Sequence, residues 1–202
     1  MSSLPQQPTD SQPFHLECLA IEDFQGILHP LTEFADDPGG VETFEIDGRP
    51  MPEPYRGLLV HERDMTSTLE RFHREKPTLE VLAKRRSETS LFRQVLLRGA
   101  RSNRVVEYGA IRIELEALSA QARWAVLEGL RPLGAILADY RVPYVSRPHS
   151  YFGVHPGSRL QEILGLTAPG MLYGRKNFLR APSGDVLAEV VEILPPARVR
   201  DH

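Results

Sequence analysis

The chain has 202 residues, of which 41% are hydrophobic and 25% charged, as expected for one globular domain and not for a fully disordered chain. Its formal net charge of −3 argues against nucleic-acid and anionic-membrane partners, because both are attracted by a positive field. The single cysteine, Cys18, excludes an intramolecular disulfide and a cysteine-based zinc site.

The first 55 residues differ in composition from the rest of the chain. Residues 1–13 are rich in Pro, Gln and Ser and predict a flexible tail. Residues 14–55 predict an N-terminal extension, with one or two short helices within 14–34 and a loop at 36–40. Neither a basic n-region with an apolar h-region nor an apolar run of about 18 residues is present, so a cytoplasmic protein without a membrane span is expected.

A domain over residues 56–197 is expected to follow. It begins with a helix near residues 67–74, for which Asp64 or Thr66 can serve as N-cap. Residues 79–85, 91–98 and 105–115 alternate as strands do.

For the second half of this domain, the sequence predicts two helices followed by further strands. Helices are expected at 120–129, with Ser119 as N-cap, and at 133–139. A strand at 140–151, an irregular insert at 153–170 and two strands at 171–180 and 186–194 follow. Runs of strands with segregated helices indicate an α+β fold around an antiparallel sheet, not an alternating βαβ fold.

Common catalytic and cofactor motifs are absent from the sequence. It contains no Walker loop, no dinucleotide-binding glycine motif, no HExxH and no Gly-x-Ser-x-Gly. Its seven histidines are scattered, without i, i+4 pairing. We therefore expect neither a metal nor a cofactor.

Three charged residues interrupt the apolar pattern of the strands. Arg93 shares its face with Val95 and Leu97, so it either extends to the sheet edge or binds an anion. Glu189 and Glu192 lie three residues apart in one strand and must point to opposite faces. One of the two carboxylates can therefore face the interior, where it needs a partner.

Pro132 precedes the second predicted helix. The N–H groups in the first turn of that helix, at Leu133 and Gly134, can bind an anion, or this is an ordinary helix start with proline at its first position.

Five motifs occur in one order between residues 58 and 197: Asp64-Met65-Thr66, Phe92-Arg93-Gln94-Val95-Leu96-Leu97, Pro132-Leu133-Gly134, Tyr173-Gly174-Arg175-Lys176 and Glu192-Ile193-Leu194-Pro195-Pro196-Ala197. Together they resemble the chorismate pyruvate-lyase (4-hydroxybenzoate synthase) family. The resemblance implies a sheet of about six antiparallel strands, with helices packed on one side and an enclosed ligand cavity. A related fold serves as the effector-binding domain of some bacterial transcription regulators.

The resemblance also implies which residues bind the carboxylate of a ring-shaped substrate. It assigns this role to the guanidinium of Arg93 and to the backbone N–H groups of Met65 and Leu133, with Gly134 beside them. Such a combination of a forked cation and helix N-termini suits a carboxylate.

At the opposite end of the ring, the resemblance places Glu192 against the hydroxyl group as a catalytic residue together with Arg93. Glu189 is the alternative if the strand register differs. Arg175 or Lys176 is the expected cation for a second carboxylate, that of the pyruvyl group.

One position departs from the family. Lyases of this family often carry a second arginine directly after a glycine, whereas here Gly109 is followed by Ala110. Either Arg112 takes over that role, or the pocket accepts a different ligand.

The function that the resemblance implies is that of a cofactor-free carbon–oxygen lyase, which converts chorismate to pyruvate and 4-hydroxybenzoate, with 3-hydroxybenzoate as the second candidate for the aromatic product. It would serve ubiquinone or secondary-metabolite biosynthesis, and the N-terminal extension would cover the cavity or form a homodimer contact. One alternative is a non-catalytic domain that binds an aromatic carboxylate, although residues 1–55 show no helix-turn-helix pattern. The other is a relative recruited to a different elimination or pericyclic step in natural-product biosynthesis.

Overall fold

The computed structural model describes residues 26–34, 41–168 and 170–197. These residues form a seven-stranded sheet in the order β1-β5-β6-β7-β4-β3-β2, with every neighbouring pair antiparallel. The strands are β1 (Glu42–Ile46), β2 (Pro77–Arg86), β3 (Ser90–Gly99), β4 (Val105–Glu114), β5 (Val145–His155), β6 (Leu172–Arg180) and β7 (Val186–Leu194). The helices are η1 (Leu31–Phe34), α1 (Tyr55–Leu59), α2 (Met65–His73), α3 (Ala120–Glu128), α4 (Leu133–Asp139) and α5 (Ser158–Leu164).

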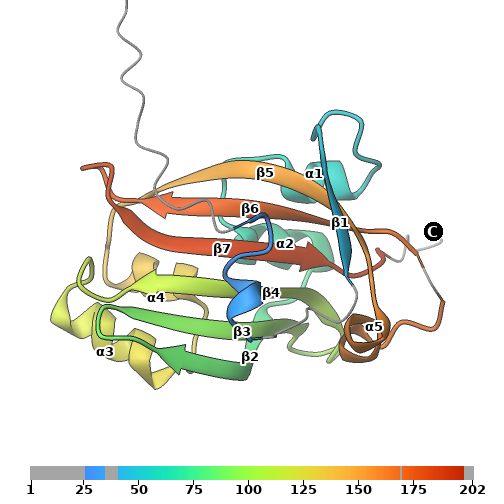
Figure 1. The fold of residues 1–202 in the computed structure, drawn as a ribbon. Helices are drawn as coiled ribbons and strands as arrows, with labels where there is room; N and C mark the ends of the chain where they lie inside the picture. The colour runs from blue at the N-terminus through green and yellow to red at the C-terminus, as the bar shows by residue number, and fades with distance from the viewer. Residues whose placement is uncertain (1–25, 35–40, 169, 198–202) are drawn as a thin grey trace, which may run out of the picture.

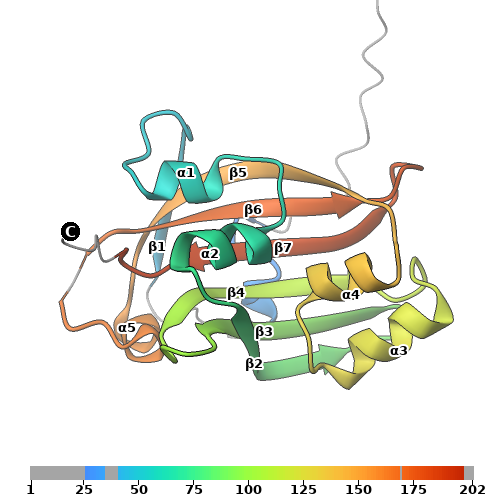
Figure 2. The ribbon, with the colours of Figure 1, turned by 180° about the vertical axis from the view of Figure 1, so that it is seen from behind.

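The sheet consists of two meanders joined at its centre. Strands β2, β3 and β4 follow one another as hairpins. Strands β5, β6 and β7 also pair in chain order, but the connection between β5 and β6 contains α5. β4 then pairs with β7 and joins the two halves. Helices α1 to α4 lie on one face of the sheet (Figure 2), whereas the short η1 crosses β3 and β4 on the other face (Figure 1). The expected α+β class with an antiparallel sheet is confirmed.

Side-chain alternation along β4 divides the core into two layers. Ile111 and Ile113 pack with residues of α3 and α4 on the face that these helices cover. Tyr108 and Ala110 point the other way and pack with Leu28, with Leu31 of η1 and with α5. We call these the helix face and the outer face of the sheet.

Helix α2 begins where the sequence predicts a cap. Of the two candidates, Asp64 is the residue used, because its Oδ1 accepts a hydrogen bond from the backbone N–H of Ser67 at 2.8 Å. Helix α3 begins in the same way, with the Ser119 hydroxyl accepting from the N–H of Ala122 at 3.3 Å. Helix α4 begins at Leu133, directly after Pro132, as its sequence predicts.

The largest differences from the sequence prediction concern β1 and β5. A strand that the sequence does not predict, β1, lies within the expected N-terminal extension and pairs with the second half of β5. This pairing and the pairing with β6 carry β5 to His155, into the stretch expected to be irregular. At its other end β5 begins at Val145, after a turn in which Arg141 has a φ of 52°.

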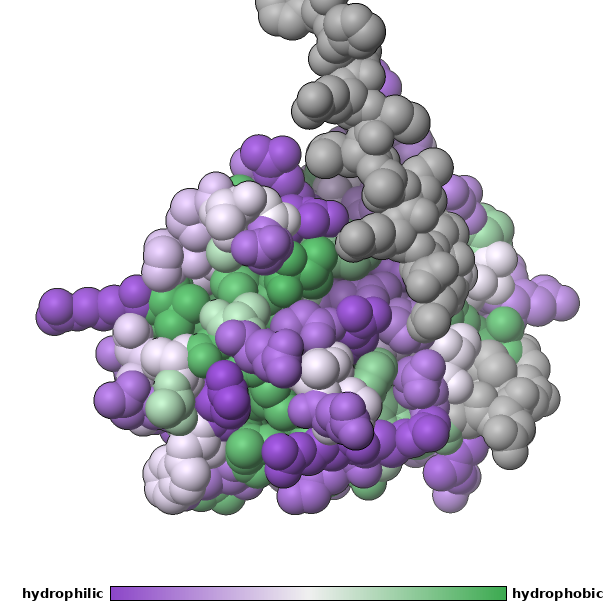
Figure 3. Space-filling model, turned by 60° about the vertical axis from the view of Figure 1, so that its left-hand side comes forward, coloured by the Kyte–Doolittle hydropathy of each residue, from purple (hydrophilic) through white to green (hydrophobic). Residues whose placement is uncertain are grey.

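Several expectations lie outside the described residues. They are the tail at 1–13, most of the helices expected within 14–34, the loop at 36–40 and the environment of Cys18. Within the described ranges, no helix is long and apolar enough to cross a membrane. Figure 3 shows hydrophilic and hydrophobic side chains interleaved on one side of the molecule.

Candidate functional site

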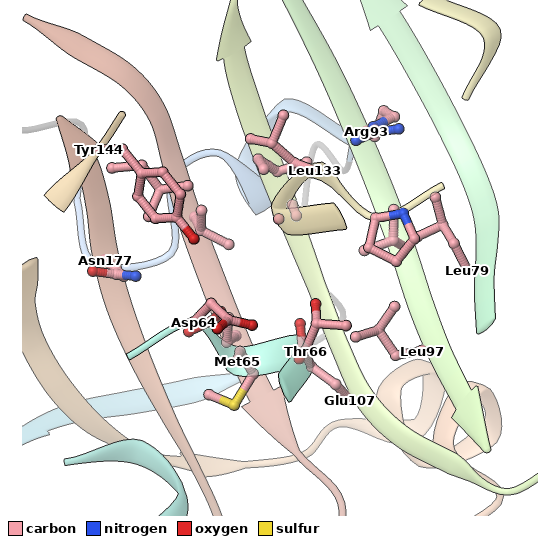
Figure 4. A pocket seen from close by; sticks show the side chains of 18 residues that line it. Asp64, Met65, Thr66, Leu79, Arg93, Leu97, Glu107, Leu133, Tyr144 and Asn177 are labelled. Carbon is pink, nitrogen blue, oxygen red and sulfur yellow. The ribbon is translucent and has the colours of Figure 1, made fainter. Parts of the chain in front are cut away.

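A cavity of about 90 Å³ lies between the helix face of the sheet and the first turns of α2 and α4. Its walls are mostly apolar and include Leu79, Val95, Leu97, Ile111, Leu179 and Val190. Five of the residues that the sequence nominated line it together: Met65, Arg93, Leu133, Gly134 and Glu192. They come from β3, β7 and the two helix starts, and thus from segments far apart in the sequence (Figure 4).

The Arg93 guanidinium is a buried cation without a counter-ion among the residues that the structure describes. The residue is only 2% exposed, and its Nε and Nη1 atoms have no hydrogen-bond partner among the described residues. Burial lowers the pKa of Arg93 to about 10, which still leaves it protonated at neutral pH. Because an unpaired buried charge is costly, the cavity is suited to an anionic group at this end.

The two helix starts contribute backbone donors to the same cavity. Met65 is the first residue of α2 and Leu133 is the first residue of α4. N–H groups in a first helical turn have no acceptor within their own helix and carry a partial positive charge. Both starts line the cavity together with Arg93.

Glu192 also faces the cavity, and a second arginine stands behind it. The Nε atom of Arg175 donates to Oε2 of Glu192 in a buried ion pair. Nη1 of Arg175 donates to the carbonyl oxygens of Leu59, at 3.1 Å, and His61, at 3.0 Å. Arg175 itself does not line the cavity, so it holds Glu192 and the segment between α1 and α2 instead of facing a ligand.

The other two candidate side chains lie on the outer face. The Lys176 Nζ is 2.7 Å from Oε1 of Glu189 and donates to the carbonyl oxygen of Gly26 at 2.8 Å. Lys176 follows Arg175 directly in β6, and neighbouring strand residues point to opposite faces. The structure therefore does not place Lys176 in the cavity, and it is Glu192 and not the alternative Glu189 that lines it.

Arg112 does not replace the arginine missing at position 110. It also points to the outer face, where its Nε donates to Glu114 at 2.5 Å and its Nη1 lies 3.9 Å from Glu189. Among the described residues that line the cavity, Arg93 is the only basic side chain.

Glu107 is a cavity residue that the sequence analysis missed. It is 5% exposed, and its Oε2 has no hydrogen-bond partner in the described part of the chain. Burial, and then the charge of Glu192, raise the pKa of Glu107 well above its ordinary value, so both favour the protonated form of its carboxyl. A signal was present, because Glu107 has the same strand parity as Gly109 and Ile111 and so interrupts an apolar face.

A metal site has no support in the described ranges. No three His, Cys, Asp or Glu side chains come together there in a way that could hold an ion.

Comparisons with known proteins define the fold of this chain. No protein-family model and no curated protein matches the sequence. The gene product SA0254 from Staphylococcus aureus is a similar solved structure, with a TM-score of 0.51, 8% identity and coverage of 69% of this chain and 98% of that one. PhnF from Mycobacterium smegmatis is also similar, with a TM-score of 0.52 and 9% identity. The match covers 67% of this chain and 64% of PhnF.

A weaker match is the ligand-binding domain of a proposed GntR-family transcriptional regulator from Bordetella bronchiseptica, with a TM-score of 0.47 and 10% identity over 62% of this chain and 91% of that domain. At such identities the two stronger matches establish a common fold and nothing about activity. The fold expected from the chorismate lyase resemblance is therefore confirmed, and membership of the lyase family is not shown.

Proposed function

We propose that this protein binds a small aromatic carboxylate in the cavity, with Arg93 as the partner of the carboxylate group. One observation carries the proposal: a guanidinium 2% exposed, with two nitrogen atoms that lack a partner among the described residues, lines the cavity. A carboxylate can accept two parallel hydrogen bonds from such a fork. The helix starts at Met65 and Leu133 add backbone donors on the same ligand.

The apolar walls and the spacing of the polar ends favour a single ring. In the strand register Arg93 lies opposite Ile111 on β4, and Glu192 lies opposite Gly109, two residues away and one strand further. The backbone positions of Arg93 and Glu192 are therefore roughly 7 Å apart along the strands and roughly 10 Å apart across them. Two long side chains that point inward from these positions leave space for about one ring, polar at each end.

The number of cations in the cavity favours ligand binding over the lyase reaction on a dianion. Chorismate carries two carboxylates, and Arg93 is the only basic side chain among the described lining residues. Arg112 and Lys176, which could have served the second carboxylate, both face outward. We therefore place binding of a monocarboxylate first and the lyase reaction second.

A thermal unfolding experiment tests the proposed binding. A ligand that binds only the folded protein raises the melting temperature as its concentration increases. We expect 4-hydroxybenzoate to raise it, and its neutral methyl ester to raise it much less, because the ester cannot pair with Arg93. Equal shifts for acid and ester would contradict a role for the carboxylate.

The lyase reaction remains the second candidate because two carboxyl groups in different states share the cavity. Glu192 forms an ion pair with Arg175, whereas burial raises the pKa of Glu107. In the reaction the C3–O bond of chorismate breaks, the C4 proton is lost and the leaving enolpyruvyl group gains a proton at its methylene carbon to become pyruvate. Aromatisation drives this elimination, so the protein needs only to position the substrate and to assist proton movement.

If the protein is a lyase, Glu192→Gln should lower the rate of pyruvate formation by about 100-fold or more, as expected for loss of a general acid–base. Glu189→Gln is the matched control, since the same change on the outer face should leave the rate per folded molecule within a few-fold of wild type. A coupled assay for pyruvate measures both. An unaffected rate in Glu192→Gln would remove Glu192 from catalysis, and no pyruvate from wild-type protein that binds 4-hydroxybenzoate would favour the non-catalytic function.

A further inference from the structure

Glu107 lies at the end of the cavity remote from Arg93. It pairs with Leu97 across β3 and β4, four residues along β3 from Arg93, which corresponds to roughly 13 Å. Figure 4 shows the side chain of Glu107 well apart from Arg93 in the same pocket. A ligand whose carboxylate pairs with Arg93 would therefore present its other end to Glu107.

Glu107 and Glu192 approach the same end of the cavity from neighbouring strands. Gly109, two residues after Glu107 on the same face of β4, pairs directly with Glu192 on β7. Diagonal neighbours on one sheet face are within reach of long side chains, and Gly109 has no side chain to separate these two. A side chain would not be accommodated there, because a Cβ at Gly109 would lie 2.1 Å from the carbonyl oxygen of Val191.

The two carboxyl groups are in different electrostatic environments. Arg175 donates directly to Glu192, so this group is an acceptor. No cation contacts Glu107 in this way within the described residues, and both burial and the charge of Glu192 raise its pKa, with Arg175 opposing them in part. A neutral carboxylic acid is a hydrogen-bond donor, whereas a carboxylate only accepts.

We propose that Glu107 and Glu192 form a donor–acceptor pair that selects a hydroxyl group on the ring of the ligand. The inference rests on the proposed function, because the ligand must first be oriented by Arg93. The hydroxyl donates to the Glu192 carboxylate and its oxygen accepts from the Glu107 carboxylic acid. The Oε2 of Glu107, which has no partner in the described structure, thereby gains one.

This arrangement discriminates between ligands of nearly equal size. An aromatic amino group can donate to Glu192, but its lone pair is delocalised into the ring and accepts hydrogen bonds poorly. Glu107 would then be left with an unpaired donor in a buried site, which is unfavourable. The preferred ligand class is consequently a hydroxylated aromatic carboxylate, and an amino-substituted one should be rejected.

Calorimetric titration of the full chain with benzoate, 4-hydroxybenzoate and 4-aminobenzoate tests this inference. For the wild type we expect a preference of at least tenfold for the hydroxyl compound over the amino compound. In Glu107→Leu the preference should fall below threefold, whereas Glu107→Gln should keep most of it, because an amide N–H can still donate. Glu116→Leu, the same change at an exposed position, is the matched control and should retain the wild-type preference.

The outcomes separate this inference from the proposed function. If the wild type binds none of the three acids, the proposed function fails. If the wild type binds the hydroxyl and amino compounds equally, or if Glu107→Leu keeps the full preference, the role of Glu107 is overturned while carboxylate binding stands. Should Glu107→Leu fail to fold, the wild-type preference and that of Glu107→Gln still decide.

Discussion

Replacing Arg93 with Met should weaken the binding of 4-hydroxybenzoate by about 2–4 kcal/mol, because the ligand carboxylate would be buried without its charged partner. The same replacement should make the ligand-free protein more stable, since it removes a buried cation that has no counter-ion in the described structure. A residue kept only for folding would not show these opposite effects. Calorimetry and denaturant unfolding measure the two quantities.

Two further variants control for this result. Arg93→Lys should recover only part of the affinity, because an ammonium group cannot form the two parallel hydrogen bonds of a guanidinium. Arg98→Met removes an arginine from the same strand that pairs with Glu80 near the surface, and should change stability by less than about 1 kcal/mol without affecting binding. Equal affinities of wild type and Arg93→Met would contradict the assignment.

The second large effect is expected on the outer face. Lys176→Met should lower the free energy of unfolding by about 3–5 kcal/mol, because it leaves the buried carboxylate of Glu189 without its closest cation. The double variant Lys176→Met/Glu189→Gln should lose less than the sum of the two single variants, since neither charge remains buried alone. Strict additivity in denaturant unfolding would show that the two groups do not interact.

The stability contribution of Glu189 should depend on pH. Burial raises the pKa of Glu189, but hydrogen bonds from His29 and Lys176 outweigh this, so the folded-state pKa is below the ordinary value of 4.5. A group with a lowered folded-state pKa stabilises the protein above its unfolded pKa and loses this contribution as the pH falls through the folded value. Below pH 4.5 wild-type stability should therefore fall more steeply than that of Glu189→Gln.

Local patterns in the sequence predict much of this fold. Alternation along β3 and β4 separates the two faces correctly, including the placement of Arg93 with Val95 and Leu97 in the cavity. The cap at Asp64 and the proline before Leu133 locate the starts of α2 and α4. These features depend on residues close in the sequence, which is why they can be read from it.

Features that depend on contacts between distant segments are harder to predict. Because neighbouring residues of a strand point to opposite faces, only one of Arg175 and Lys176 can face the helices. The pairing of β6 with β7 determines which of the two it is. Likewise, β1 is a five-residue segment that becomes a strand by pairing with β5. Glu107 could have been found from the sequence, because it alternates in phase with the apolar residues of β4. An acidic residue on such an otherwise apolar face is itself a signal of a site.

A crystal structure of the protein with 4-hydroxybenzoate tests the central claim most directly. We expect the ring between the apolar walls, with the carboxylate oxygens about 2.7–2.9 Å from two neighbouring guanidinium nitrogens of Arg93, and the hydroxyl group toward Glu192 and Glu107. A ligand bound in the reverse orientation, or bound outside the cavity while Arg93 stays unpaired, would contradict carboxylate recognition by Arg93.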